Sequence, residues 1–217
     1  MPQALFGRRT SCTKEISKVT YSIVGFGKIG QAIAKAFARS GIEVAVATTR
    51  PPQQLASTAA TLGAAVKPID LAEALEADVI FLAVPFKSHR DVAGKKPNWT
   101  GKIIVDATNA YGVDPADLGG RPSSAAIEEA FAGAQLVKGF NHLPASTLAQ
   151  DPNVNGGRRV IFIASDAKDP ASEVSKIAEK LGFAPIYLGK LAEGGALVQA
   201  RGSSWAQLIF QDLVKFS

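Results

Sequence analysis

A glycine-rich turn between two apolar segments leaves this chain few ways to begin its fold. The stretch YSIVGFGKIGQAIAKAFARSG, residues 21–41, joins a short apolar run to a longer run whose apolar residues recur at helical spacing. This pattern predicts a strand over Val19–Val24 and a helix over Ile29–Ser40, which stops before Gly41. A strand, a glycine turn and a helix in this order are typical of the first βαβ unit of a parallel sheet.

The three glycines of the turn follow the GxGxxG spacing, and each has its own structural reason. Gly25 permits a tight turn, Gly27 lets the backbone approach a diphosphate, and Gly30 lets the helix pack closely on the strand. The unpaired N–H groups and the dipole at the start of a helix favour an anion there. A turn that serves only packing is the alternative. The pattern predicts a dinucleotide site formed by Gly25, Phe26, Gly27, Lys28, Ile29 and Gly30.

Strands and helices alternate along the rest of the chain. Apolar segments predict further strands over Glu43–Ala47, Ala65–Lys67, Val79–Val84, Ile103–Asp106, Leu136–Val137, Arg159–Ser165 and Pro185–Leu188. Helical spacing and start signals predict helices over 51–62, Leu71–Glu76, Ser123–Ala132, Ala145–Gln150, Pro170–Leu181 and Ser203–Phe216. We therefore expect an α/β fold, a Rossmann-type doubly wound and mainly parallel sheet with a small C-terminal lobe.

Composition argues against several other functional classes. The chain has one cysteine, Cys12, and two histidines far apart in sequence, His89 and His142, so we expect neither an intrachain disulfide nor a metal site. No apolar run approaches the roughly 18–20 residues that span a bilayer. The net charge of +5 comes from scattered basic residues without interleaved aromatic residues. We therefore expect a cytoplasmic protein whose partners are small molecules, with no nucleic acid and no membrane.

The end of the second predicted strand discriminates between NAD and NADP. An NAD site usually carries an acidic residue there for the ribose 2′-hydroxyl, whereas an NADP site carries a cation and hydroxyl groups. Here the strand ends in ATTR, and no acidic residue occurs between Glu43 and Asp70. Thr48 and Thr49 can donate to a 2′-phosphate, and the planar fork of Arg50 can bind it. These residues predict NADP(H), with an ordinary polar turn as the alternative.

Three later strands also end in segments that carry polar residues or proline: AVPF, DATNAYG and KGFNHLP. Ligands of doubly wound sheets lie beyond the carboxyl ends of the strands, so these segments should meet at one rim. Local turn chemistry is the alternative role for each of them. The candidate cofactor contacts here are Ala83, Val84, Pro85 and Asn109, and the candidate substrate-pocket residues are Asn141 and His142, none of which is a certain catalytic residue.

Residues that would act on an alcohol as a general acid or base are not found at recognisable spacings. The chain has no GxSxG motif, and no tyrosine stands four residues from a lysine. A hydride can pass directly between two stacked rings without such a group, and the protein then has only to position them. The sequence therefore favours hydride transfer from a nicotinamide to a planar redox partner.

Five segments in this order resemble the coenzyme F-420-dependent NADP oxidoreductase family: GFGKIGQAIAKAFARSG, ATTR, DATNAYG, KGFNHLPAS and LGKLAEGGALVQARG. The resemblance covers nearly the whole chain and implies an NADP-binding Rossmann-type domain, a small C-terminal lobe and a homodimer. It also implies hydride transfer between NADPH and a deazaflavin, coenzyme F-420, or a flavin, as in the related module of ferric reductases. Asn141 would lie near the second ring. The segment RGSSW, residues 201–205, departs from the Gly-Gly-Pro of many relatives.

We therefore predict an NADPH-dependent oxidoreductase that transfers a hydride between NADP(H) and a deazaflavin- or flavin-like electron acceptor. The expected parts are a flexible N-terminal extension over 1–18, an NADP-binding Rossmann-type domain over 19–189 and a small helical lobe over 190–217. Two other functions stay open. One is a non-catalytic NADP(H) sensor, and the other is a reductase of small imine or keto substrates, which needs a longer helical second domain than follows Leu188.

Overall fold

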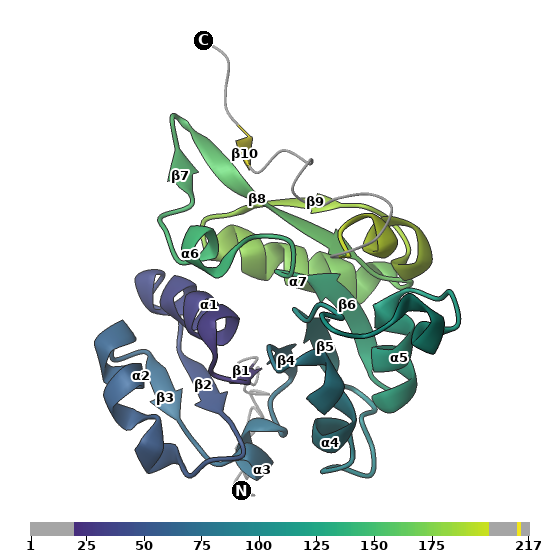
Figure 1. The fold of residues 1–217 in the computed structure, drawn as a ribbon. Helices are drawn as coiled ribbons and strands as arrows, with labels where there is room; N and C mark the ends of the chain where they lie inside the picture. The colour runs from purple at the N-terminus through teal and green to yellow at the C-terminus, as the bar shows by residue number, and fades with distance from the viewer. Residues whose placement is uncertain (1–19, 200–211, 214–217) are drawn as a thin grey trace, which may run out of the picture.

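The computed structural model describes residues 20–199 and 212–213, and its central element is one extended sheet. Its strands are β1 Tyr21–Val24, β2 Val44–Ala47, β3 Val66–Pro68, β4 Val79–Leu82, β5 Ile103–Asp106, β6 Gln135–Gly139, β7 Asn153–Val154, β8 Gly157–Ala164, β9 Ala184–Tyr187 and β10 Asp212–Leu213. They follow the order β10-β8-β6-β5-β4-β1-β2-β3, with β7 and β9 also paired to β8 (Figure 1).

The order of the parallel strands reverses at β1. The chain runs outward from β1 through β2 to β3, then returns to place β4, β5 and β6 on the other side of β1. β8 is antiparallel to β6, and β9 is parallel to β8, so the second half of the chain extends the same sheet. The predicted Rossmann-type, doubly wound and mainly parallel α/β fold is confirmed. Its switch point lies between β1 and β4, where ligands of this fold class bind.

Helices cover both faces of the sheet (Figure 1). On one face α1 Lys28–Arg39, α2 Ala56–Leu62, α6 Ala145–Leu148 and α7 Lys168–Lys180 pack on the sheet; on the other lie α3 Leu71–Ala74, α4 His89–Ala93 and α5 Ser123–Ala130. Three 3₁₀ turns, Pro52–Gln54, Phe86–Ser88 and Pro115–Leu118, and a π-helical turn, Leu191–Gly195, complete the described helical segments. Helix α1 buries Ile33 and Phe37 against Ile23 of β1, because its apolar residues recur every three or four positions.

Several predicted boundaries are corrected by the structure. The helix predicted over 51–62 is a 3₁₀ turn followed by α2, because the pair Pro51-Pro52 favours a tight first turn. The helix predicted over Ser203–Phe216 falls outside the described residues except at Asp212–Leu213, which form β10 and pair with β8. The sequence reading also missed α4 and the β7–β8 hairpin, in which Asn155 and Gly156 take the positive φ angles of a tight hairpin turn.

Within the described part of the chain, none of the helices combines the length and apolar character that crossing a bilayer requires.

Candidate dinucleotide-binding site

The glycine turn between β1 and α1 lies at the switch point of the sheet. Gly25 has a φ of +100°, and a Cβ on it would lie 2.4 Å from the carbonyl oxygen of Ala83. A Cβ on Gly30 would lie 1.9 Å from the Gly25 carbonyl oxygen, whereas a Cβ on Gly27 would meet no described atom within 4 Å. Packing therefore accounts for Gly25 and Gly30 but not for Gly27. The open space at Gly27 is what the close approach of a diphosphate requires.

Helix α1 presents its first turn to the same space. Gly27 is its N-cap, no described side chain caps it, and no acidic residue stands in its first turn. The first N–H groups of the helix therefore keep their capacity to bind an anion, and the helix dipole favours negative charge there. The Gln31 side chain donates to the Phe26 carbonyl oxygen at 2.9 Å, which holds the turn in place without filling it.

A cavity of about 510 Å³ opens beside this turn, between the end of β2 and α4. Nine of the thirteen predicted cofactor contacts line it. The other four, Lys28, Ile29, Gly30 and Asn109, do not, and Gly30 is buried under the turn. The lining includes Gly25, Phe26, Gly27, Thr48, Thr49, Arg50, Ala83, Val84 and Pro85. Six further lining residues were not predicted as contacts from the sequence: Val24, Leu71, Ser88, Asp91, Val92 and Lys95.

The loop after β2 is arranged to present hydroxyl and guanidinium groups. The backbone N–H of Arg50 donates to the Thr48 hydroxyl oxygen at 3.0 Å, so this oxygen acts as acceptor within the loop. The hydroxyl hydrogen of Thr48 is then left to donate outward. The expectation that Thr48, Thr49 and Arg50 surround a 2′-phosphate stays a prediction, and their placement in the wall of the cavity agrees with it.

The segments after β5 and β6 are joined by a buried ion pair. Lys138 Nζ lies 2.9 Å from Asp106 Oδ2 and also donates to the Thr108 carbonyl oxygen, and both charged side chains are almost fully buried. Asp106 Oδ1 accepts from the backbone N–H and the hydroxyl of Thr108. Asp106 and Lys138 are register partners on adjacent parallel strands. The polar residues of these motifs thus fix the frame beside the switch point.

Asn109 and Asn141 face each other across the same two segments. Asn109 Nδ2 donates to the Asn141 carbonyl oxygen at 2.8 Å, and Asn141 Nδ2 donates to Asn109 Oδ1 at 3.1 Å and to the Val198 carbonyl oxygen at 2.9 Å. Phe140, the residue before Asn141, is fully buried at a φ of +61°, a strained value for a side chain of this size. The structure brings the two predicted asparagines together, but away from the lining of the 510 Å³ cavity.

His142 turns into the protein rather than toward the cavity. Its ring packs edge-on against Phe162, with ring centroids 4.8 Å apart, and 8% of the residue is exposed. Burial lowers the pKa of His142 to about 4, so the imidazole is neutral near pH 7. A ring in this place shapes the core behind β6 and β8. His142 does not line the 510 Å³ cavity, and its predicted place in a substrate pocket stays a prediction.

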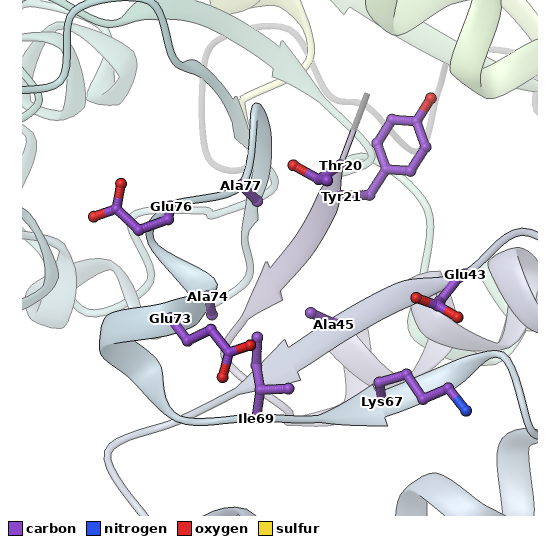
Figure 2. Close-up of a pocket in the computed structure, with 10 residues that line it drawn as sticks. All are labelled: Thr20, Tyr21, Glu43, Ala45, Lys67, Ile69, Glu73, Ala74, Glu76 and Ala77. Carbon is purple, nitrogen blue, oxygen red and sulfur yellow. The ribbon is translucent and has the colours of Figure 1, made fainter. Parts of the chain in front are cut away.

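A second cavity, of about 400 Å³, opens at the amino ends of β1 and β2, beside β3 and α3. Its acidic residues are spread around the wall: Figure 2 shows the carboxylates of Glu43, Glu73 and Glu76 well apart, with Lys67 on β3. Among the described residues, no group of histidine, cysteine and carboxylate side chains is placed to hold a metal ion. This cavity therefore offers no converging set of reactive groups.

A Rossmann-type sheet with an open glycine turn at its switch point defines a dinucleotide-binding protein. A model of the family described as NADP oxidoreductase, coenzyme F-420-dependent, matches residues 20–110. A solved structure described as hypothetical protein SMa0349 from Sinorhizobium meliloti is 40% identical to this chain, covers 92% of it and 97% of its own length, and superimposes with a TM-score of 0.84. The chain belongs to the coenzyme F-420-dependent NADP oxidoreductase family, a family of NADP-dependent oxidoreductases.

One curated relative and one further solved structure are also similar to this chain. Metalloreductase STEAP3 of Rattus norvegicus is 29% identical over 188 residues, which are 86% of this chain and 36% of the relative. The chain thus spans about a third of the length of the curated relatives it matches. A structure from Arthrobacter sp. FB24, described as a candidate F-420-dependent NADP reductase, is 23% identical, covers 80% of this chain and 86% of its own, and has a TM-score of 0.65. This last likeness concerns the fold alone.

Proposed function

We propose that this protein binds NADPH at the switch point and passes a hydride from it to a planar acceptor of the deazaflavin or flavin type. The observation that carries the proposal is the space at Gly27, which opens onto a cavity that also contains Arg50. The space at Gly27 has room for a diphosphate against bare backbone, and Arg50 can bind a further phosphate on the ribose. Both are features of the binding of a phosphorylated dinucleotide.

The residues of the site would bind and orient the cofactor. The first turn of α1 receives the diphosphate, Arg50 and the Thr48 hydroxyl receive the 2′-phosphate, and Ala83, Val84 and Pro85 support the nicotinamide side. When bound, the nicotinamide supplies the hydride, and a ring stacked on it takes up the two electrons. The buried Asp106–Lys138 pair holds the neighbouring strand ends in place during this transfer. Fixed geometry of this kind is what a direct hydride transfer needs.

The family and the curated relatives indicate different electron acceptors. The family description points to a deazaflavin, whereas the curated relatives are metalloreductases of which this chain spans about a third. A flavin is therefore the second acceptor of the proposal. We further propose a homodimer in the cytoplasm, for which size-exclusion chromatography with light scattering and cell fractionation provide the measurements.

The test is a screen of acceptors followed by the loss of NADPH absorbance. We expect oxidation of NADPH with a deazaflavin or a flavin, and slower oxidation of NADH. Arg50→Ala should weaken NADPH by roughly 1–3 kcal/mol, the size of a hydrogen bond to a charged group, and NADH much less. Equal losses for both nucleotides would contradict the 2′-phosphate assignment. If NADPH binds tightly and none of the acceptors oxidises it, the result would instead favour a cofactor sensor.

A further inference from the structure

The wall of the cavity that faces the glycine turn is one side of a helical segment. Ser88, Asp91, Val92 and Lys95 line the cavity, and their spacing of three, one and three residues puts them on one face. The segment runs from the 3₁₀ turn Phe86–Ser88 through α4, and hydrogen bonds from Gly94 N to Arg90 O and from Lys95 N to Val92 O continue it past the end of α4. The backbone therefore holds Lys95 on the same face as Ser88.

Position along this segment separates the two ends of the cavity. Ala83, directly after β4, packs against Gly25, and the Ser88 N–H donates to the Pro85 carbonyl oxygen at 2.8 Å, so Ser88 is the part of this wall nearer to the glycine turn along the chain. Lys95 is seven residues further on, which at ~1.5 Å per helical residue is about 10 Å away along the axis. With the diphosphate of the proposed function at the glycine turn, Lys95 is at the end of this wall farther from the diphosphate.

Asp91 and Lys95 decide the charge of this cavity. The charged residues of its lining are Arg50, Asp91 and Lys95. With Arg50 and Asp91 alone the lining would be neutral, and a carboxylate in the wall would repel a phosphate of nearly two negative charges. Lys95 stands one helical turn after Asp91 on the same face, which is the spacing at which opposite charges interact. Its ammonium restores a positive balance.

We propose that Lys95 is a second cation for the 2′-phosphate of NADP(H), and that it offsets the carboxylate of Asp91 in the same wall. The inference rests on the proposed function only in taking a nicotinamide nucleotide as the occupant of the cavity. It adds a specificity residue that comes from the turn after α4 rather than from the ATTR segment after β2. Selection of NADP over NAD then depends on both walls of the cavity.

The neighbouring lysine provides a matched control. Lys96 carries the same charge one position later, but it forms an ion pair with Glu76 and does not line the cavity. By calorimetry, Lys95→Ala should raise the Kd for NADP⁺ about three- to tenfold, as expected for an exposed charged contact, and leave the Kd for NAD⁺ within about twofold. Lys96→Ala should change neither. Asp91→Asn should act in the opposite direction and tighten NADP⁺ binding.

Three outcomes for the Lys95 variants decide the inference, and a fourth, for wild-type protein, separates it from the proposed hydride transfer. Retained NADP⁺ affinity in Lys95→Arg, together with weaker salt dependence in Lys95→Ala, would support a charge contact with phosphate. An equal loss of NADP⁺ and NAD⁺ affinity in Lys95→Ala would overturn the inference, because Lys95 would then act on the part that the nucleotides share. An unchanged Kd for NADP⁺ would overturn it too. If wild-type protein binds NADP⁺ but does not oxidise NADPH with any of the acceptors, the proposed hydride transfer is ruled out while the role of Lys95 stands.

Discussion

At both ends of the central strands, an aspartate carboxylate accepts hydrogen bonds from the backbone N–H and the hydroxyl of a threonine, but the two pairs differ in burial. At the carboxyl end, buried Asp106 accepts from the backbone N–H and hydroxyl of Thr108; at the amino end, Asp78 accepts from the same two groups of Thr20 in an exposed position. The buried carboxylate also pairs with Lys138. Water can replace the bonds at Asp78 at little cost, but it cannot reach those at Asp106. The carboxyl end is therefore the rigid end.

Both ends also carry a cavity, and volume does not tell them apart. The cavity at the carboxyl end measures about 510 Å³ and the one at the amino end about 400 Å³. The difference lies in the backbone and in the charges. The first has the open turn at Gly27 and the unfilled start of α1, whereas the second is lined by strand starts and scattered carboxylates. Chemistry and rigidity together mark the carboxyl end as the binding edge.

The largest effect should come from breaking the buried pair. Lys138→Met leaves the Asp106 carboxylate buried without its cation, which should lower the free energy of unfolding by about 3–5 kcal/mol in urea titrations. Asp78→Asn, at the exposed aspartate–threonine pair, should cost less than about 1 kcal/mol. The double variant Asp106→Leu/Lys138→Met should be more stable than Lys138→Met, because no lone charge stays buried. Similar losses at Asp78 and Lys138 would contradict the contrast in rigidity.

As the pH falls, the free energy of unfolding should decrease first through His142, which follows β6 at the carboxyl end of the sheet, and only at lower pH through Asp78 at the amino end. Burial lowers the folded-state pKa of His142 to about 4, below its ordinary 6.5. The unfolded chain then binds the proton more readily, so the stability that His142 contributes is complete above pH 6.5 and falls as the pH drops from 6.5 toward 4. At ~1.36 kcal/mol per pKa unit, the total is about 3 kcal/mol.

Urea titrations between pH 7 and pH 4.5 measure this effect, and His142→Phe provides the control because it removes the titrating group. The pKa of Asp78 is lowered by its hydrogen bonds to the Thr20 backbone and hydroxyl, so its contribution is lost only as the pH falls below about 3.8, the ordinary value. The two groups therefore act in separate pH windows. If the variant kept the same slope as wild type between pH 6.5 and 4.5, the loss would have another source.

The next effect separates the glycines that pack from the glycine that binds. Gly27→Ala should fold as wild type, since its Cβ would meet no described atom within 4 Å, but it should weaken NADP⁺ roughly 10- to 100-fold by occupying the diphosphate space. Gly30→Ala should instead destabilise the fold, because its Cβ would overlap the Gly25 carbonyl oxygen. Calorimetry and thermal melts on both variants give the result. A Gly27→Ala protein with normal affinity would show that the open turn holds no diphosphate.

How far the sequence leads differs between these features. The glycine turn and the ATTR segment depend on local pattern and on the rule that strand ends meet at one edge, so the sequence could place them. The partners of Asn109 and Asn141 could not be predicted in this way, because two parallel strands and the segment at Val198 must first be in register. An asparagine amide can form hydrogen bonds to a ligand or to neighbouring backbone, and the sequence does not distinguish the two. Here the two side chains bind each other and backbone carbonyl oxygens.

The wall formed by α4 was missed for a related reason. Pro85 and Gly94 bound a segment too short for a helical pattern to stand out, and its first turn is 3₁₀. The acidic residue that lines the cavity, Asp91, comes from helix α4 and not from the end of β2, where the pattern of this fold class places such a residue. The direction of the His142 ring depends on contact with Phe162 of β8, which no local pattern encodes. Tertiary contacts, more than propensity, decided what was missed.

The smallest expected effect tests the comparison from its other side. Glu43→Gln removes a carboxylate at the amino-end cavity, across the length of β2 from the loop that carries Arg50. A strand of four residues spans ~13 Å, and salt screens charges over about 8 Å at 0.15 M, so the Kd for NADP⁺ should change by less than about 1.5-fold. Calorimetry beside Arg50→Ala gives the scale. An effect as large as that of Arg50→Ala would move the bound nucleotide to the cavity of Figure 2 and reverse the assignment of the two ends.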